Sequence, residues 1–153
     1  MRIALIALAL FAAGAAPDPS RVRLFGGRQG VQLLGQCSRA APRANRVFLP
    51  DPAAVARAEA AVPPALIARE SARARRLGIA DTAALRRGWR VEATGLQRHG
   101  RRTLYLSFLP RGGGFDDATY PGPTVICDGG ETLFGAEVDP RGAVLSLAFN
   151  GAV

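Results

Sequence analysis

The chain has 153 residues, which is a typical length for a single domain, and its formal net charge is +8. The chain has 20 arginines and no lysine. A net positive charge favours anionic partners. The basic residues are not interleaved with aromatic side chains as in single-strand binders, which argues against a nucleic-acid partner.

The first sixteen residues have the pattern of a secretory signal peptide. Met1-Arg2 is a short positive start, Ile3 to Ala13 is apolar, and small residues precede position 17. This run, like every later one, is shorter than the roughly 20 apolar residues that a membrane span needs. We therefore expect a periplasmic or secreted protein without a transmembrane span, an irregular arm over residues 17–45 and a single domain over 46–153.

The two cysteines, Cys37 and Cys127, suggest one disulfide in an exported chain, with two free thiols as the alternative. The bond would close a loop of about 90 residues and stabilise the fold by roughly 4 kcal/mol. A zinc site is disfavoured because the chain has one histidine and no closely spaced cysteine pair. We expect neither a metal nor a cofactor.

A helical region begins at Asp51-Pro52, where aspartate is suited to the N-cap and proline to the first turn. Pro63-Pro64 predicts a kink or a split, because a proline inside a helix removes a hydrogen bond and clashes with the preceding turn. Gly78 is placed to end the helix. Asp81-Thr82 is placed to cap one further turn.

Two antiparallel hairpins follow. A two-residue turn at His99-Gly100 would pair Val91 with Phe108 and Ala93 with Leu106, which brings the apolar faces together.

The second hairpin has a type I turn signal at Asp139–Gly142. A four-residue loop there would pair Phe134 with Leu147 and Ala136 with Leu145. A slip of one residue would exchange the two faces of the strands, so turn and pattern agree on this register.

Short strands are expected near Val47–Leu49 and at Thr124–Cys127. Helices followed by a meander imply an α+β fold, with the helix, kinked or split at Pro63-Pro64, packed on a curved antiparallel sheet of four to five strands. Cystatin-like and PepSY-like folds share this outline, which is an analogy of fold and not of function.

No catalytic set emerges from the reactive residue types. The single histidine, His99, falls at a predicted hairpin tip, away from a position beside a cysteine or serine nucleophile. The Gly/Pro-rich loop 111–123 is a better place for function, because long loops often carry binding residues.

Candidate ligand-binding residues lie within that loop or shortly after it: Asp116, Asp117, Tyr120, Asp128 and Glu131. Two carboxylates roughly 5–9 Å apart could hydrolyse a glycoside, and carboxylates with backbone carbonyls could hold Ca²⁺. Asp-Gly-Gly is also a common turn, so a structural role is the simpler interpretation. A second group, Arg98, Arg101 and Arg102, could clamp a carboxylate or phosphate, or form a solvated turn.

The C-terminal half carries a resemblance. The segments Gly100–Pro110, Val125–Gly130 with Cys-Asp-Gly-Gly, Phe134–Asp139 with Phe-Gly-Ala-Glu, and Leu147–Gly151 with Ala-Phe-Asn-Gly form one series. This series resembles a family of uncharacterised exported proteobacterial proteins, although Val138 stands where that family has an aromatic residue. The resemblance implies export and a shared fold, and it implies no activity.

The sequence thus favours a non-enzymatic periplasmic binding or accessory protein, such as an inhibitor-type module. Its partner would be a periplasmic protein or an envelope polymer, bound through residues 111–123 and the acidic turn. One alternative is a cell-wall-directed hydrolase that uses carboxylates near Asp128 and Glu131. Another is an envelope surface protein held by its arginines.

Overall fold

The computed structural model describes residues 20–112, 114 and 120–151, and it confirms the α+β fold class. The described helices are α1 (Gly27–Leu33), α2 (Pro52–Arg76) and α3 (Thr82–Gly88), with a 3-10 turn, η1, at Gly130–Thr132. The strands are β1 (Val22–Phe25), β2 (Arg46–Phe48), β3 (Trp89–Arg98), β4 (Arg101–Pro110), β5 (Phe134–Val138) and β6 (Val144–Phe149). The predicted signal peptide lies outside the described residues.

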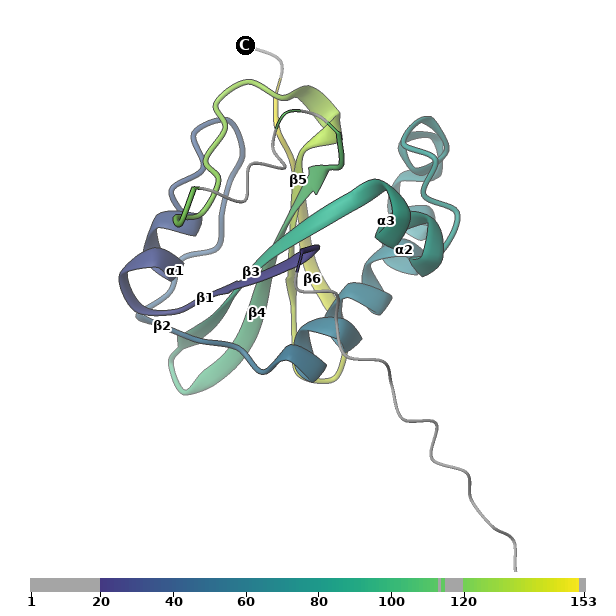
Figure 1. The fold of residues 1–153 in the computed structure, drawn as a ribbon. Coiled ribbons are helices and arrows are strands. Elements are labelled where there is room, and N and C mark those ends of the chain that lie inside the picture. The colour runs from purple at the N-terminus through teal and green to yellow at the C-terminus, as the bar shows by residue number, and fades with distance from the viewer. Residues whose placement is uncertain (1–19, 113, 115–119, 152–153) are drawn as a thin grey trace, which may run out of the picture.

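The six strands form one sheet in the order β1-β3-β4-β5-β6, and β2 also pairs with β3 (Figure 1). β1 is parallel to β3, whereas the other pairs are antiparallel. The sheet therefore has one strand more than expected and one parallel pair. Both differences involve residues 17–45, because this predicted irregular arm contains β1 and α1, which are too short to show a clear period.

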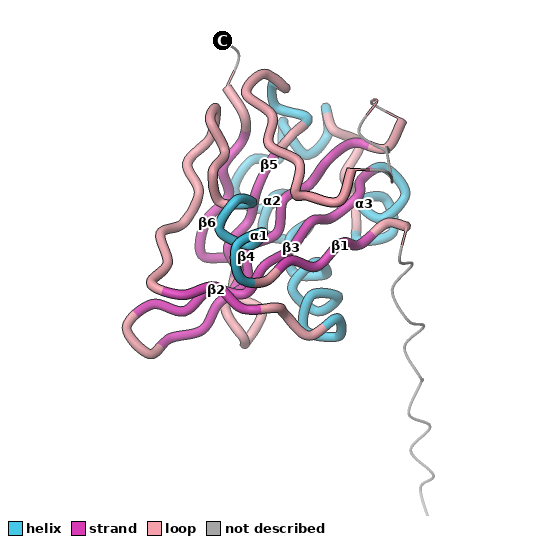
Figure 2. The backbone as a smooth tube through the Cα atoms, turned by 60° about the vertical axis from the view of Figure 1, so that its left-hand side comes forward, coloured by secondary structure: helices cyan, strands magenta, loops and turns pink. Residues whose placement is uncertain are grey.

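The two faces of the sheet differ in chemistry. α2 and α3 cover one face, while α1 and the loops beside it cover the other (Figure 1, Figure 2). The α2 face is an apolar core that includes Val62, Leu66, Phe108 and Phe134. The opposite face also buries polar side chains, among them Arg90, Glu92, Thr94, Ser107 and Glu137.

The helix ends agree with the sequence signals. The Ala54 N–H donates to the Asp51 carboxylate over 2.9 Å, and Pro52 is the first helical residue of α2. Gly78 follows the helix with φ of +67°, a left-handed conformation that glycine adopts without a Cβ penalty. The N–H of Ala84 donates to Asp81, which caps α3 as predicted.

α2 continues through Pro63-Pro64, and its non-helical backbone occurs instead at Glu70, with φ −143° and ψ 56°. The predicted position of the kink is therefore wrong. Pro64 has no N–H to offer the Ala60 carbonyl one turn earlier. The Thr82 hydroxyl of α3 donates to that carbonyl over 3.4 Å, which partly replaces the backbone hydrogen bond that the proline cannot form.

The first hairpin has the predicted register. Val91 pairs with Phe108 and Ala93 with Leu106. His99 and Gly100 have φ of 46° and 78°, as a two-residue turn with two left-handed positions requires.

The register of the second hairpin is shifted by two residues from the prediction, so Phe134 pairs with Phe149 and Ala136 with Leu147. The predicted faces survive because a shift of two keeps the side-chain alternation. Two local features cause the shift. Gly142 has φ of +88° and the Asp139 N–H donates to the Ala143 carbonyl, which shortens the loop, and a bulge adds a residue in β6.

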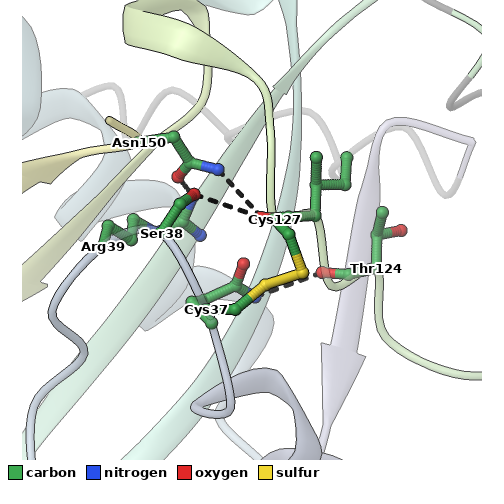
Figure 3. The surroundings of a disulfide bond; sticks show 8 residues. Cys37, Ser38, Arg39, Thr124, Cys127 and Asn150 are labelled. Carbon is green, nitrogen blue, oxygen red and sulfur yellow. Dashed lines mark hydrogen bonds between the residues drawn. A yellow bond between two sulfur atoms is a disulfide. The ribbon is translucent and has the colours of Figure 1, made fainter. Parts of the chain in front are cut away.

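The predicted strand Thr124–Cys127 is a loop. Side chains take the backbone groups that a strand would offer to a ladder: Gln36 donates to the Thr124 carbonyl, and Ser38 and Asn150 donate to the Ile126 carbonyl (Figure 3).

The predicted disulfide is confirmed and joins this loop to the segment after α1. Cys37 and Cys127 are linked with a Cα–Cα distance of 4.9 Å (Figure 3). The bond fixes two irregular segments over the polar face of the sheet.

Candidate anion-binding site

The turns of the two hairpins meet at one end of the sheet. β4 pairs with β5 so that Leu104 lies opposite Val138. The start of β4 and the turn after β5 are therefore neighbours. Between them lies a cavity of about 730 Å³, called here the arginine hollow. Its lining consists of Arg98, His99, Arg101, Arg102, Thr103, Asp139, Pro140, Arg141 and Leu145.

The acidic groups near the hollow already have partners. Glu137 is buried on β5, where it pairs with Arg98 over 2.5 Å and accepts a hydrogen bond from the Thr103 hydroxyl over 2.8 Å. The Asp139 carboxylate accepts the N–H groups of Arg141 and Ala143, both at 2.8 Å. Both carboxylates are therefore engaged in local contacts that stabilise β5 and the turn after it.

The positive charges of the arginines in the hollow are only partly balanced by carboxylates. Arg101 and Arg141 are exposed, and neither pairs with a carboxylate among residues 20–112, 114 and 120–151. The guanidinium of Arg102 lies 4.1 Å from the ring centroid of Phe48, a cation–π contact that orients it. The hollow therefore presents free guanidinium donors from two hairpins, and such donors bind carboxylates and phosphates in bidentate geometry.

The predicted group Arg98, Arg101 and Arg102 is thus brought together, with Arg98 committed to Glu137. Arg141, about forty residues further along the chain, also lines the hollow and was not part of the predicted group. The signal that could have found it is the meander itself. In a β3-β4-β5-β6 meander, the first and third turns lie at the same end of the sheet.

The predicted acidic site is not assembled in the described part of the chain. Asp116 and Asp117 lie outside the described residues, and Asp128 is exposed in the loop before η1. Glu131 faces α2, where Arg73 and Arg76 donate to its carboxylate at 2.8–3.2 Å. The hydrogen bond from Arg76, followed by that from Arg73, lowers the pKa of Glu131 to about 2, so this carboxyl group is poorly suited to act as a general acid.

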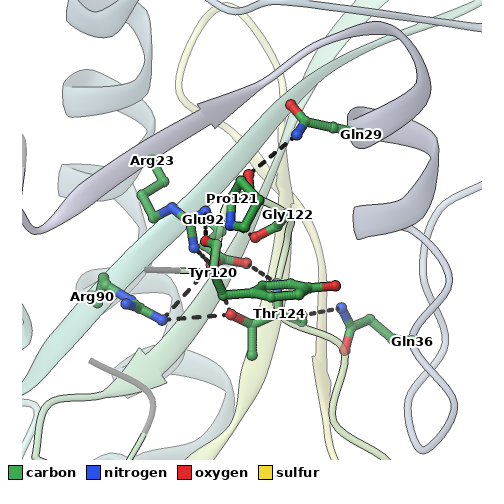
Figure 4. Close-up of polar contacts among 9 residues, drawn as sticks. All are labelled: Arg23, Gln29, Gln36, Arg90, Glu92, Tyr120, Pro121, Gly122 and Thr124. Carbon is green, nitrogen blue, oxygen red and sulfur yellow. Dashed lines mark hydrogen bonds and ion pairs between the residues drawn. The ribbon is translucent and has the colours of Figure 1, made fainter. Parts of the chain in front are cut away.

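Tyr120 begins a segment that is held on the polar face (Figure 4). Arg23 donates to the carbonyls of Tyr120 and Gly122, both at 2.8 Å. The buried Glu92 accepts the N–H of Thr124 over 2.7 Å and its hydroxyl over 2.9 Å. The Tyr120 side chain is exposed, while its backbone anchors the loop, which indicates a structural role for this segment.

Within the described ranges, no group of three or more histidine, cysteine, aspartate or glutamate residues is arranged to hold a metal ion. In the same part of the chain, no helix combines the length and the apolar character that a membrane crossing requires.

We found no match to the chain among protein-family models, curated proteins or solved structures. The resemblance to exported proteobacterial proteins stays a prediction.

Proposed function

We propose that the protein is a non-enzymatic, exported binding protein that holds an anionic group of its ligand in the arginine hollow. The observation that carries this proposal is the convergence of Arg101 and Arg141, two exposed cations from separate hairpins without a carboxylate partner among the described residues. The partner would be an envelope molecule that displays carboxylate or phosphate groups.

Two further observations support this assignment. The signal-peptide pattern of residues 1–16 predicts export, and the Cys37–Cys127 disulfide suits an oxidising compartment. The chemistry of the hollow favours binding over catalysis, because its one histidine, His99, sits in the turn itself and is not paired there with a nucleophile.

The experiment is a calorimetric titration of the folded protein with pyrophosphate, a compact probe with several anionic oxygens. We compare the wild type with the double variant Arg101→Glu, Arg141→Glu. The matched control is Arg75→Glu, Arg111→Glu, which changes the net charge equally but at the distal ends of α2 and β4. Each lost charge-assisted hydrogen bond of about 1.4 kcal/mol is a factor of ten, so we expect binding to weaken at least about tenfold in the first variant.

In the control variant we expect a small loss, and in the wild type weaker binding as salt increases, because exposed charges are screened. Equal weakening in both double variants would mean that only the net charge matters. That outcome, or the absence of binding to the wild type at low salt, would refute the proposed site.

A further inference from the structure

A second cavity adjoins the arginine hollow. Its volume is about 420 Å³, which is within the range of small-molecule sites. The two cavities are neighbours, because both are lined by Arg102, Thr103, Asp139, Pro140 and Arg141.

The second cavity has an apolar wall between α2 and the sheet, and Arg57 of α2 adds a cationic side chain to its lining. Ala54 and Ala58, four residues apart on one side of α2, lie against the cavity with Leu104 of β4 and Phe48 of β2. Ala58 is 3% exposed and Leu104 is 8% exposed, so both belong to the core. The small alanine side chains leave space that a leucine or phenylalanine would fill.

The acidic groups at this cavity are also occupied. The Asp51 carboxylate accepts the Ala54 N–H at the start of α2, and the Asp139 carboxylate accepts two N–H groups of its own turn. Arg102 lies where the cavities meet, stacked on Phe48. A cavity with an apolar wall therefore lies beside a cationic one, with Arg102 at their boundary.

We propose that the ligand is an anionic amphiphile, with its hydrocarbon part between α2 and Leu104 and its anionic group in the arginine hollow. This inference rests on the proposed function and specifies the ligand class for the same site. The apolar cavity contributes affinity through burial of methylene groups, and the arginines select the charge of the headgroup.

The test uses straight-chain alkanoates from butanoate to decanoate, each below its micelle concentration, titrated into the full folded protein. Each buried methylene increases affinity about threefold to fourfold until the cavity is full, so we expect a steady rise and then a plateau. Alkylammonium ions of equal length bind weakly, because their headgroup is repelled by the arginines.

The variant Ala54→Phe fills the apolar cavity and is expected to remove the dependence on chain length while pyrophosphate binding is retained. Its matched control is Ala53→Phe, which places the same side chain at the adjacent exposed position of α2. Thermal unfolding verifies that both variants are folded. The chain-length series on the wild type is decisive even if Ala54→Phe does not fold.

Affinity that does not change with chain length, with pyrophosphate binding intact, would overturn the amphiphile inference and leave the proposed function standing. Failure of the wild type to bind both pyrophosphate and every alkanoate would overturn both. Equal binding of alkylammonium and alkanoate would show that the chain binds without the arginines, which also contradicts the inference.

Discussion

Arg39 is a buried guanidinium whose hydrogen-bond partners in the described chain are neutral. Its Nε donates to the Tyr105 hydroxyl over 3.0 Å, and its two terminal nitrogens donate to Asn150 and Ser107 at 2.6 Å. Figure 3 shows this residue beside the disulfide. The side chain joins the segment after α1 to β4 and to the residue after β6.

Replacement of Arg39 by methionine leaves three polar groups without their donor. We expect a loss of about 3 kcal/mol in the free energy of unfolding. The three buried acceptors left without a donor destabilise the fold, and this effect exceeds the gain from no longer burying a charged group. Urea denaturation measures this change. Arg43→Met, at a nearby exposed position, should stay within about 0.5 kcal/mol of the wild type. A more stable Arg39→Met protein would contradict this account.

The lowered pKa of Glu131 predicts that the stability of the fold depends on pH. Its pKa is lowered from 4.5 to about 2 by the hydrogen bonds from Arg76 and Arg73. A carboxyl group with a lowered folded-state pKa stabilises the fold above its unfolded pKa, and this contribution is lost as the pH falls through the folded pKa. The wild type should therefore exceed Glu131→Gln in stability at pH 6, and the difference should vanish towards pH 2. Urea denaturation across this range, at low and high salt, measures it.

High salt should reduce the difference at pH 6, since both Glu131 and Arg76 are reached by solvent. A difference that is constant from pH 6 to pH 2 would mean that the glutamine acts by some means other than loss of the charge.

At the scale of elements, Glu59 joins α2 to its neighbours. Its carboxylate is buried, Arg21 before β1 donates to both oxygens at 2.5 and 2.9 Å, and Arg86 of α3 donates at 3.0 Å. Arg21 is itself buried, at 7% exposure. The pairing therefore ties the start of the sheet and α3 to the N-terminal half of α2.

Glu59→Gln should be one of the most destabilising single changes, at about 3–5 kcal/mol, because it leaves the Arg21 charge buried without its counter-ion. Arg86→Met should lower the free energy of unfolding much less, because the Arg86 side chain is 44% exposed and the ion pair between Glu59 and Arg21 remains. The free energies of unfolding of both variants test this order. Similar losses in the two would contradict the leading role of the Arg21 pair.

The elements that the sequence predicted well are those with strong local signals. The cap at Asp51, the end at Gly78 and the turn at His99-Gly100 are determined by residues that are adjacent in the chain. β1 and α1 were missed because seven residues or fewer give no reliable period, and their position depends on pairing with distant β3. The strand expected at Thr124–Cys127 has suitable residues, but distant side chains take its backbone groups.

The candidate site shows the same limit. Local sequence grouped Arg98, Arg101 and Arg102, whereas Arg141 and the alanines of α2 join them only through tertiary structure. The second cavity lies where α2 presents the small side chains of Ala54 and Ala58 to the sheet. Such a gap is determined by the distance between α2 and the sheet, which the sequence pattern does not specify.

At the scale of the whole molecule, the two faces of the sheet are stabilised in different ways. The α2 face is held by apolar burial under a regular helix. The opposite face is covered by short elements and loops (Figure 2). These are held by a smaller apolar cluster around Phe25, Leu33 and Leu96, by side-chain hydrogen bonds and by one disulfide. A covalent link is most useful here, because this apolar cluster is smaller than the core under α2.

The disulfide should therefore account for a large share of the total stability. In the chain-entropy model, a link across a separation of 90 residues contributes about 4 kcal/mol, against about 5–15 kcal/mol for a typical domain. We expect Cys37→Ser, Cys127→Ser to lower the urea midpoint strongly and to increase the m-value, because the unlinked unfolded chain exposes more surface. A reductant should shift the wild type to the same midpoint and leave the double variant unchanged. An unchanged midpoint in the reduced wild type would show that the hydrogen bonds around Arg39 and Glu92 hold the polar face without the covalent link.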